Sequence, residues 1–186
     1  SYTKMNLRLR NLEPFSFDHH FMYFFGADAL GRSMIARLIL ATQNTMFIAG
    51  SAVILSMTLG GVLGLISGYY GGRTGNLIMR MADIIMSFPS LLLAVIVLYM
   101  FDPGLLNLVI VLAFTRMPIY MRTARAEVLE IRERLFVSAA ISMGASNLRI
   151  IFKHIAPFTI PTLITIATLD FCLLYTSDAA DEFSWV

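Results

Sequence analysis

The feature that most constrains this chain is one long run without charge. Residues 38–72 contain no Lys, Arg, Asp or Glu. A helix needs about 20 mostly apolar residues to cross the hydrocarbon core of a bilayer, so this run is long enough to span a membrane. The composition agrees, because 58% of the residues are hydrophobic and 14% are charged, whereas soluble domains carry about 25% charged residues. The sequence therefore predicts an all-α integral membrane protein.

Four apolar runs define the predicted spans of a polytopic helical bundle. They lie at about residues 45–69, 84–101, 105–120 and 157–169. We expect Pro89 to kink the second span, because proline lacks the amide that a helix needs. Residues 1–44 then form a segment outside the membrane, and residues 45–171 form the membrane domain.

Basic residues gather in one long loop. Seven of the 14 Lys and Arg residues lie within 116–153. Because cytoplasmic loops carry an excess of positive charge, this distribution places the loop at 121–156 in the cytoplasm. The short turn at 102–104 is then outside, and so is the segment 1–44.

Small residues recur at every fourth position of the first span. They are Ala52, Ser56, Gly60, Gly64 and Gly68. Residues at this spacing fall on one helix face, and small residues allow two helices in lipid to approach closely. The pattern predicts a helix-packing face. We favour another helix of the same chain as its partner, with a helix of a second subunit as the alternative.

The charged loop predicts two short helices joined by an elbow of small residues. Gly144 can adopt the left-handed conformation that ends a helix, and Ser146 can cap the next helix. Pro157 marks the start of the fourth span, because it restricts the residue before it. The next helix has an apolar face at Leu148, Ile151, Phe152 and Ile155. Such a knob suits docking into a cleft on another protein, and an amphipathic loop on lipid headgroups is the alternative.

Two spacings in this loop are specific. Three residues separate the pair Ala139 and Ala140 from Gly144, and Pro157 lies thirteen positions after Gly144. Both spacings resemble the "EAA" loop of ATP-binding-cassette importer permeases. Ser138 stands where that family usually has Glu.

Further matches resemble the peptide and nickel branch of that family. His154, just before the end of the loop, is typical of the branch. Residues 26–33 resemble its Gly-Thr-Asp-x-x-Gly-Arg-Asp element, and residues 68–72 and 83–89 resemble its loop and following helix. The resemblance covers about residues 25–171 and is greater to the second of the two peptide-permease subunits than to the first.

The resemblance implies the type I importer permease fold in a bacterial inner membrane, with about four of six spans present here. Family members do no covalent chemistry, so we expect no enzyme activity. The implied partners are a second permease subunit, two cytoplasmic ATPase subunits, an external solute-binding protein and membrane lipid, but no nucleic acid. No cofactor is expected, because ATP would be bound by the partners. The sequence agrees in having no Gly-x-x-x-x-Gly-Lys-Ser/Thr phosphate loop.

The resemblance also implies which residues couple this subunit to the ATPase. The expected coupling residues are Ser138, Ala139, Ala140, Gly144, Ala145, Ser146, Arg149 and Pro157. The expected substrate is a peptide, with a nickel-specific member of the same family as one alternative. An ion-coupled secondary transporter is another, but it would need discontinuous helices and a buried charge near the midplane. A membrane enzyme is disfavoured, because the sequence has no paired carboxylates, His-Glu-x-x-His helix or Ser-centred elbow.

Few charged residues fall in or beside the predicted spans. Arg80 and Asp83 are expected at the cytoplasmic interface, where both reach water. Arg116 lies within the third span, and we expect its long side chain to extend to the cytoplasmic surface, with a place on the transport pathway as the alternative. His19 and His20 lack a third ligand at suitable spacing, so no metal site is expected.

The end of the chain departs from the expected pattern. Asp178, Asp181 and Glu182 arrive where an apolar helix should continue, and each acid costs free energy in hydrocarbon. The 15 residues of 157–171 would span only about 22 Å of a core about 30 Å thick. We therefore expect residues 172–186 to be a non-native tail, with a real but divergent cytoplasmic or external tail as the alternative.

The orientation can be tested by thiol labelling. In a Cys172→Ser background, an impermeant reagent applied to whole cells should label Gly104→Cys but not Asn147→Cys. Labelling of Asn147→Cys alone would reverse the orientation.

Overall fold

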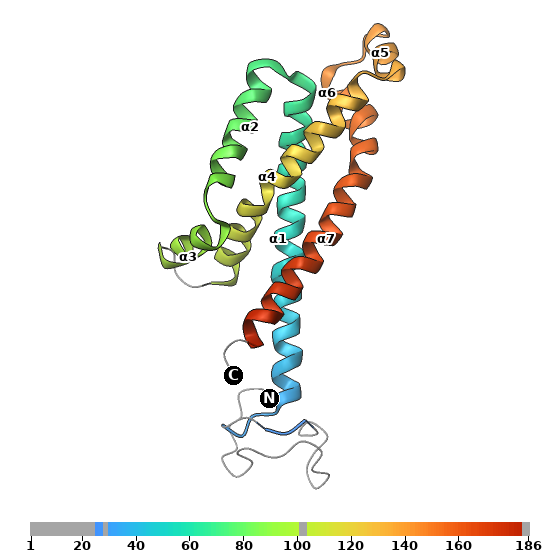
Figure 1. Cartoon of the computed structure of the whole chain (residues 1–186). Helices are drawn as coiled ribbons and strands as arrows, with labels where there is room; N and C mark the ends of the chain where they lie inside the picture. Colours follow the sequence, from blue (N-terminus) through green and yellow to red (C-terminus); the bar gives the residue numbers. More distant parts are fainter. Residues whose placement is uncertain (1–24, 28–29, 101–103, 184–186) are drawn as a thin grey trace. The chain divides into compact units, whose positions relative to one another are not determined.

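The computed structural model describes residues 25–27, 30–100 and 104–183 (Figure 1). Its elements are α1 (Met34–Tyr70), α2 (Gly72–Ser87), α3 (Ser90–Met100), α4 (Leu105–Arg132), α5 (Leu135–Ser142), α6 (Asn147–Arg149), the π-helical turn η3 (Ile150–Ile155) and α7 (Ala156–Phe183). In this part of the chain the one β feature is an isolated bridge between Ala27 and Ser33. The predicted all-α class is confirmed.

The chain divides into two compact units, Ser1–Phe47 and Ile48–Val186. In the first unit a turn precedes α1. Gly26 and Gly31 have positive φ angles of 85° and 70°, and the Ser33 hydroxyl accepts a hydrogen bond from the Ala36 amide at 3.4 Å, which caps the helix start. His19, His20 and most of the predicted external segment lie outside the described residues. The last part of that segment is helical, because α1 begins at Met34 and not near residue 45.

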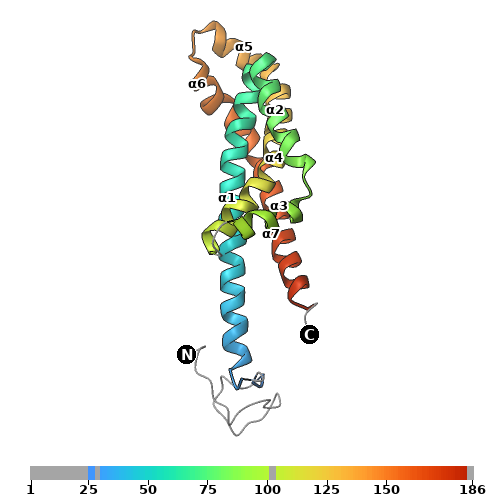
Figure 2. The same ribbon diagram turned by 90° about the vertical axis from the view of Figure 1, so that its left-hand side faces the viewer.

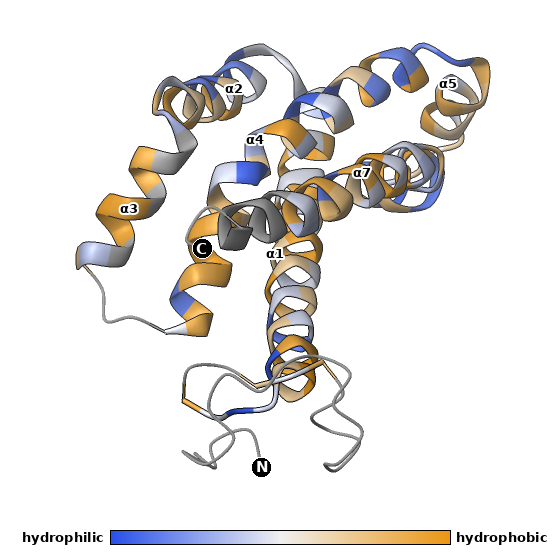
Figure 3. Cartoon of the chain, turned by 60° about the horizontal axis from the view of Figure 1, so that its bottom comes forward, coloured by the Kyte–Doolittle hydropathy of each residue, from blue (hydrophilic) through white to orange (hydrophobic). Residues whose placement is uncertain are grey.

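Three helical stretches of the described chain are long and apolar enough to cross a membrane: Met34–Tyr70, Leu105–Arg132 and Asn147–Thr176. The predicted second span, 84–101, is interrupted at Phe88 and Pro89, where an interruption was expected. Its chain breaks into α2 and α3 at Pro89, where Phe88 is extended (φ −89°, ψ 134°). Proline removes an amide and clashes with the preceding turn, so the predicted kink is a complete break. Figure 1 shows α3 turning away from the direction of α2, and Figure 3 shows that α3 is mostly hydrophobic.

The third and fourth spans also have boundaries that differ from the prediction. α4 continues past residue 120 to Arg132, because Met121, Ala124, Val128 and Ile131 remain buried along one face. α7 begins at Ala156, which is helical (φ −53°, ψ −41°) despite the following proline. Helical residues precede Pro157 without a break from Asn147, and the Ala156 amide bonds to the Ile151 carbonyl in a π-helical pattern. Such a local π adjustment is one way in which a helix accommodates proline.

The π-helical turn changes which residues of this segment are buried. Ile150, Ile151 and Ile155 are buried, whereas Leu148 and Phe152 are exposed. Of the four residues predicted to form the apolar face of this helix, only Ile151 and Ile155 are buried. A π-helix bonds residue i to residue i+5, which aligns Ile150 with Ile155 on the inner side.

Close packing of α1 on α4 organises the second unit. The small residues of α1 are all buried: Ala52, Ser56, Gly60, Gly64 and Gly68. A Cβ atom added at Gly64 would lie 2.5 Å from the Ala124 Cβ atom and 2.6 Å from the Met121 carbonyl oxygen. Added at Gly60 or Gly68, it would lie 2.6 Å from an atom of α4. The small-residue face therefore meets a helix of the same chain, and only glycine fits at these contacts.

Three groups of buried apolar side chains fill the second unit. The largest, which we call the elbow core, joins α1, α4, α5, η3 and α7 and comprises Leu65, Val128, Ile131, Val137, Ile150, Ile151, Ile155 and Ala156. A second contains Tyr120, Ala124 and Leu163, and a third contains Ala49, Val53 and Leu174. Many large apolar side chains of α1, α3 and α7 are exposed, as expected for helices that face lipid.

The glycine contacts make a prediction about stability. Gly64→Ala should lower the free energy of unfolding by about 1–3 kcal/mol, because the new methyl group overpacks the contact with α4. Gly50→Ala is the matched control in the same helix, since its Cβ atom would lie 3.8 Å from its nearest neighbour, Phe171. Thermal unfolding in detergent should show a lower midpoint for Gly64→Ala only. Equal midpoints for the two variants would contradict the packing.

Candidate functional site

The most distinctive structure outside the packed spans is a tight elbow, which we define as residues 133–146. It contains α5 and the turn before α6, and it lies at the end of α4 that is farther from α3 (Figures 1 and 2). Gly144 has φ 77°, so the predicted left-handed conformation is confirmed. The Gly144 amide donates to the Ile141 carbonyl at 2.9 Å and the Ala145 amide donates to the Ala140 carbonyl at 3.1 Å. This pair of bonds is a Schellman motif, which satisfies the last carbonyls of α5.

The Schellman motif explains why small residues occur at fixed spacing here. Ala140 is buried and Ala145 packs against the elbow core, so both contribute to the inner side of the turn. Ser146 has the extended backbone of an N-cap (φ −68°, ψ 149°), but its side chain makes no capping bond. The predicted capping role of the Ser146 hydroxyl is therefore wrong, and its carbonyl accepts the Ile150 amide at 3.0 Å instead.

The elbow has a buried side and an exposed side. Val137 belongs to the elbow core, and Ala140 is also buried. The exposed members of the predicted set are Ser138, Ala139, Gly144, Ser146, Arg149 and Pro157. The structure thus brings most of that set to the outer surface, while Pro157 lies beyond it, in the first turn of α7.

Large apolar side chains also lie on the outer surface, and the sequence analysis missed them. Leu135 is 88% exposed and Met143 is 81% exposed. Ile141 and Leu148 are exposed as well, and so are the basic side chains of Arg134 and Arg149. The signal that could have found Leu135 is its position out of phase with the buried Val137 and Ala140.

Arginines of α4 hold the corner between α1 and α2. Nη1 of Arg125 donates to the Ser67 hydroxyl at 2.8 Å and to the Gly75 carbonyl at 2.7 Å. Ser67 is fully buried and donates to the same carbonyl at 3.1 Å. Nη1 of Arg132 donates to the Tyr69 carbonyl at 3.2 Å. The basic cluster that predicted a cytoplasmic loop therefore also caps the end of α1.

A second set of polar contacts lies between α4 and α7. Nη1 of Arg116 lies 3.4 Å from Oδ1 of Asp170, and the Tyr120 hydroxyl donates to Oδ2 at 3.1 Å. The Asp170 side chain is 6% exposed and that of Arg116 is 33% exposed. The expectation that Arg116 extends to the cytoplasmic surface is wrong. An unpaired charge inside a membrane is costly, and the ion pair with Asp170 compensates it.

Arg122 pairs with Asp83 of α2 through two exposed side chains. Asp83 was expected to reach water at the cytoplasmic interface, and its side chain is 59% exposed. Because both groups are exposed, the pair contributes little to stability.

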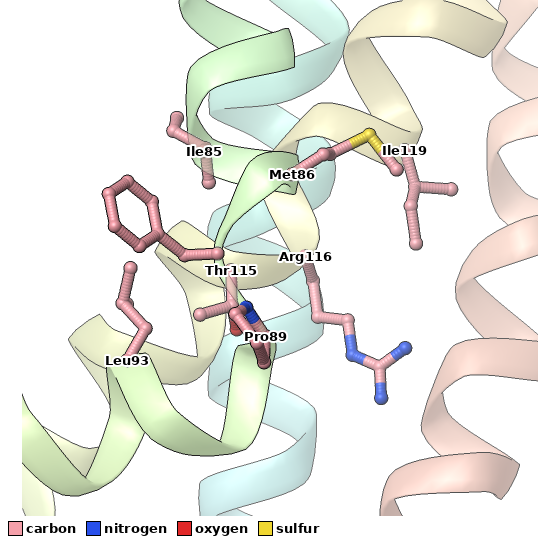
Figure 4. Close-up of a pocket in the computed structure, with 8 residues that line it drawn as sticks. Ile85, Met86, Pro89, Leu93, Thr115, Arg116 and Ile119 are labelled. Atoms are coloured by element: carbon pink, nitrogen blue, oxygen red, sulfur yellow. The ribbon is translucent and has the colours of Figure 1, made fainter.

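A cavity of about 330 Å³ lies between the break at Pro89 and α4. Its lining residues are Ile85, Met86, Phe88, Pro89, Leu93, Thr115, Arg116 and Ile119 (Figure 4). The guanidinium of Arg116 is directed away from Pro89 toward α7, so its aliphatic stem forms the cavity wall. A broken helix and a buried charge were the features expected of an ion-coupled transporter. Since both occur here, they do not separate that class from the importer permeases.

Comparison with known proteins does separate the importer permeases from the ion-coupled transporters. Residues 60–177 match the family described as "Binding-protein-dependent transport system inner membrane component". The di/tripeptide transport system permease protein of Pseudomonas aeruginosa is 40% identical over 149 residues, which cover 80% of this chain and 49% of that protein. The nickel transport system permease protein of Escherichia coli K12 is 36% identical over 148 residues, 80% of this chain and 53% of that protein.

A third relative covers more of the chain. The oligopeptide transport system permease protein of Bacillus subtilis is 34% identical over 168 residues, 90% of this chain and 53% of that protein. The chain therefore spans about half the length of the curated relatives it matches.

These matches confirm the resemblance found in the loop at 121–156, which lies inside the matched region. With three membrane-spanning candidates among its described helices, the chain is a multi-pass protein of the bacterial inner membrane. It belongs to the binding-protein-dependent transport system inner membrane component family, as an ATP-binding-cassette importer permease of the peptide and nickel branch.

Proposed function

We propose that this chain belongs to the membrane-spanning permease subunit of an ATP-driven peptide importer and that its elbow docks into a cytoplasmic ATPase subunit. The permease forms half of the solute pathway, and a second permease subunit forms the other half. An external solute-binding protein delivers the peptide. ATP is bound and hydrolysed by two ATPase subunits, so this chain needs no cofactor and performs no covalent chemistry.

The observation that carries the proposal is the two-sided construction of the elbow. Val137 and Ala145 fix its inner side on the elbow core, so the elbow moves with the helices behind it. Its outer side exposes Leu135 and Met143 next to small residues. An exposed apolar patch with a polar rim is typical of a protein interaction site. Force applied to such a patch reaches the spans because the inner side is packed.

The charges around the patch support a protein cleft as the occupant. Arg134, Arg149 and Lys153 are exposed around it, and the neighbouring Glu130 pairs with Arg134 at 2.8 Å. A partner cleft with an apolar floor and acidic rim complements this arrangement. Ser138, Ala139 and Gly144 carry short or no side chains, which allows the partner to approach the backbone of the knob.

The substrate class rests on the relatives. Two of the three relatives described above carry peptide transport in their names and one carries nickel transport. We propose peptides as the substrate, with nickel as the alternative. Uptake of a labelled dipeptide and of radioactive nickel by the same assembled importer discriminates between them.

Gly144 provides the test of the coupling role. In the full-length permease with its partners, Gly144→Val should abolish most ATP-driven peptide uptake while membrane insertion stays normal. A Cβ atom there meets no neighbour within 4 Å, but a left-handed backbone costs a non-glycine residue about 1–2 kcal/mol, so the turn changes shape.

Gly144→Asn is the matched control at the same position, because asparagine adopts the left-handed conformation far more readily than valine does. The turn therefore keeps its shape, and Gly144→Asn should retain most of the uptake. Wild-type uptake by Gly144→Val, with the ATPase copurifying at the normal level, would contradict the coupling role of the elbow.

A further inference from the structure

Tyr69 lies where the end of α1 meets both ends of the elbow. Its carbonyl is among the last of α1, where helix carbonyls have no amide partner within the helix. Nη1 of Arg132, the last residue of α4, donates to this carbonyl at 3.2 Å. The Tyr69 hydroxyl donates to Oδ1 of Asn147, the first residue of α6, at 3.0 Å. One residue of α1 is thus bonded to the residue before the elbow and to the residue after it.

These bonds differ in kind from the apolar contacts of the elbow core. The elbow core consists of apolar side chains, and apolar contact is non-directional, so it tolerates small sliding and rotation. A hydrogen bond weakens steeply when its angle or length changes. The bonds at Tyr69 therefore add a directional constraint to the packed contact between the elbow and α1.

The end of α1 is in turn fixed to the start of α2. Arg125 binds both Ser67 and Gly75, and a Cβ atom added at Gly75 would lie 2.6 Å from the Ser67 carbonyl oxygen. Displacement of Tyr69 therefore moves the whole corner between the two helices. The contacts form a continuous connection from the elbow through Tyr69 to α1 and α2.

We infer that Tyr69 is a positioning residue for coupling: its hydroxyl, bonded to Asn147, transmits displacement of the elbow to the corner between α1 and α2. This inference rests on the proposed function, because it requires an ATPase that moves the elbow. It assigns to Tyr69 no contact with ATP or solute. Loss of the hydroxyl should let ATP hydrolysis continue while fewer solute molecules cross the membrane for each ATP.

The test removes one oxygen atom. Full-length permease is reconstituted with its partner permease, ATPases and binding protein, and labelled dipeptide transported per ATP hydrolysed is measured. Tyr69→Phe should lower this ratio about two- to fivefold, the factor that corresponds to one modest hydrogen bond, at an unchanged unfolding midpoint. Tyr70→Phe is the matched control, because Tyr70 is the exposed neighbour of Tyr69. The two rings meet edge to face, with their centroids 5.3 Å apart.

Asn147 variants separate a specific bond from general damage. Asn147→Ala should lower the ratio by the same factor as Tyr69→Phe, and the double variant should lower it no further. Asn147→Asp should retain the wild-type ratio, because a carboxylate accepts the same hydrogen bond. An unchanged ratio in Tyr69→Phe, or losses that multiply in the double variant, would overturn the inference.

The outcomes also distinguish this inference from the proposed function. If the wild-type assembly shows no ATP-driven uptake, the proposed function fails. If the wild type is coupled and Tyr69→Phe is equally coupled, the importer role stands and the role of Tyr69 is wrong.

Discussion

The approach of α1 to the backbone of α4 determines the positions of the other elements of the second unit. In lipid the hydrophobic effect does not bring helices together, so van der Waals contact must do so. Gly60, Gly64 and Gly68 allow this contact, since a methyl group at any of them would collide with α4. Because α4 also carries the elbow at its end, this contact aligns the elbow with the end of α1.

Polar groups along α4 complete the alignment. Arg116 and Tyr120 bind Asp170 of α7, Glu127 accepts a hydrogen bond from Thr162 of α7 at 3.0 Å, and Arg125 holds the corner between α1 and α2. Within a membrane such groups need partners, so each contact limits rotation of α4 about its axis. The glycine contacts set how close α4 lies, and the polar contacts set which of its faces points to each neighbour.

The sequence predicted those features whose cause is local. The glycine row, the break at Pro89 and the left-handed turn at Gly144 each follow from the stereochemistry of one residue type. The length of α4, the pairing of Arg116 and the π-helical turn depend on neighbours distant in sequence, and these were missed. The non-native origin of residues 172–186 stays a prediction; α7 continues to Phe183, and Leu174 is buried against Ala49 and Val53.

In the proposed importer, the exposed side of the elbow is the surface that meets the ATPase. A photoreactive amino acid placed at Met143, which is 81% exposed, tests it in cells that contain all subunits. The same amino acid at Tyr99 of α3, which is 91% exposed, is the control at a position remote from the elbow. We expect a crosslink to the ATPase from position 143 and none from position 99. A position-143 variant that is functional yet crosslinks only to lipid would contradict it.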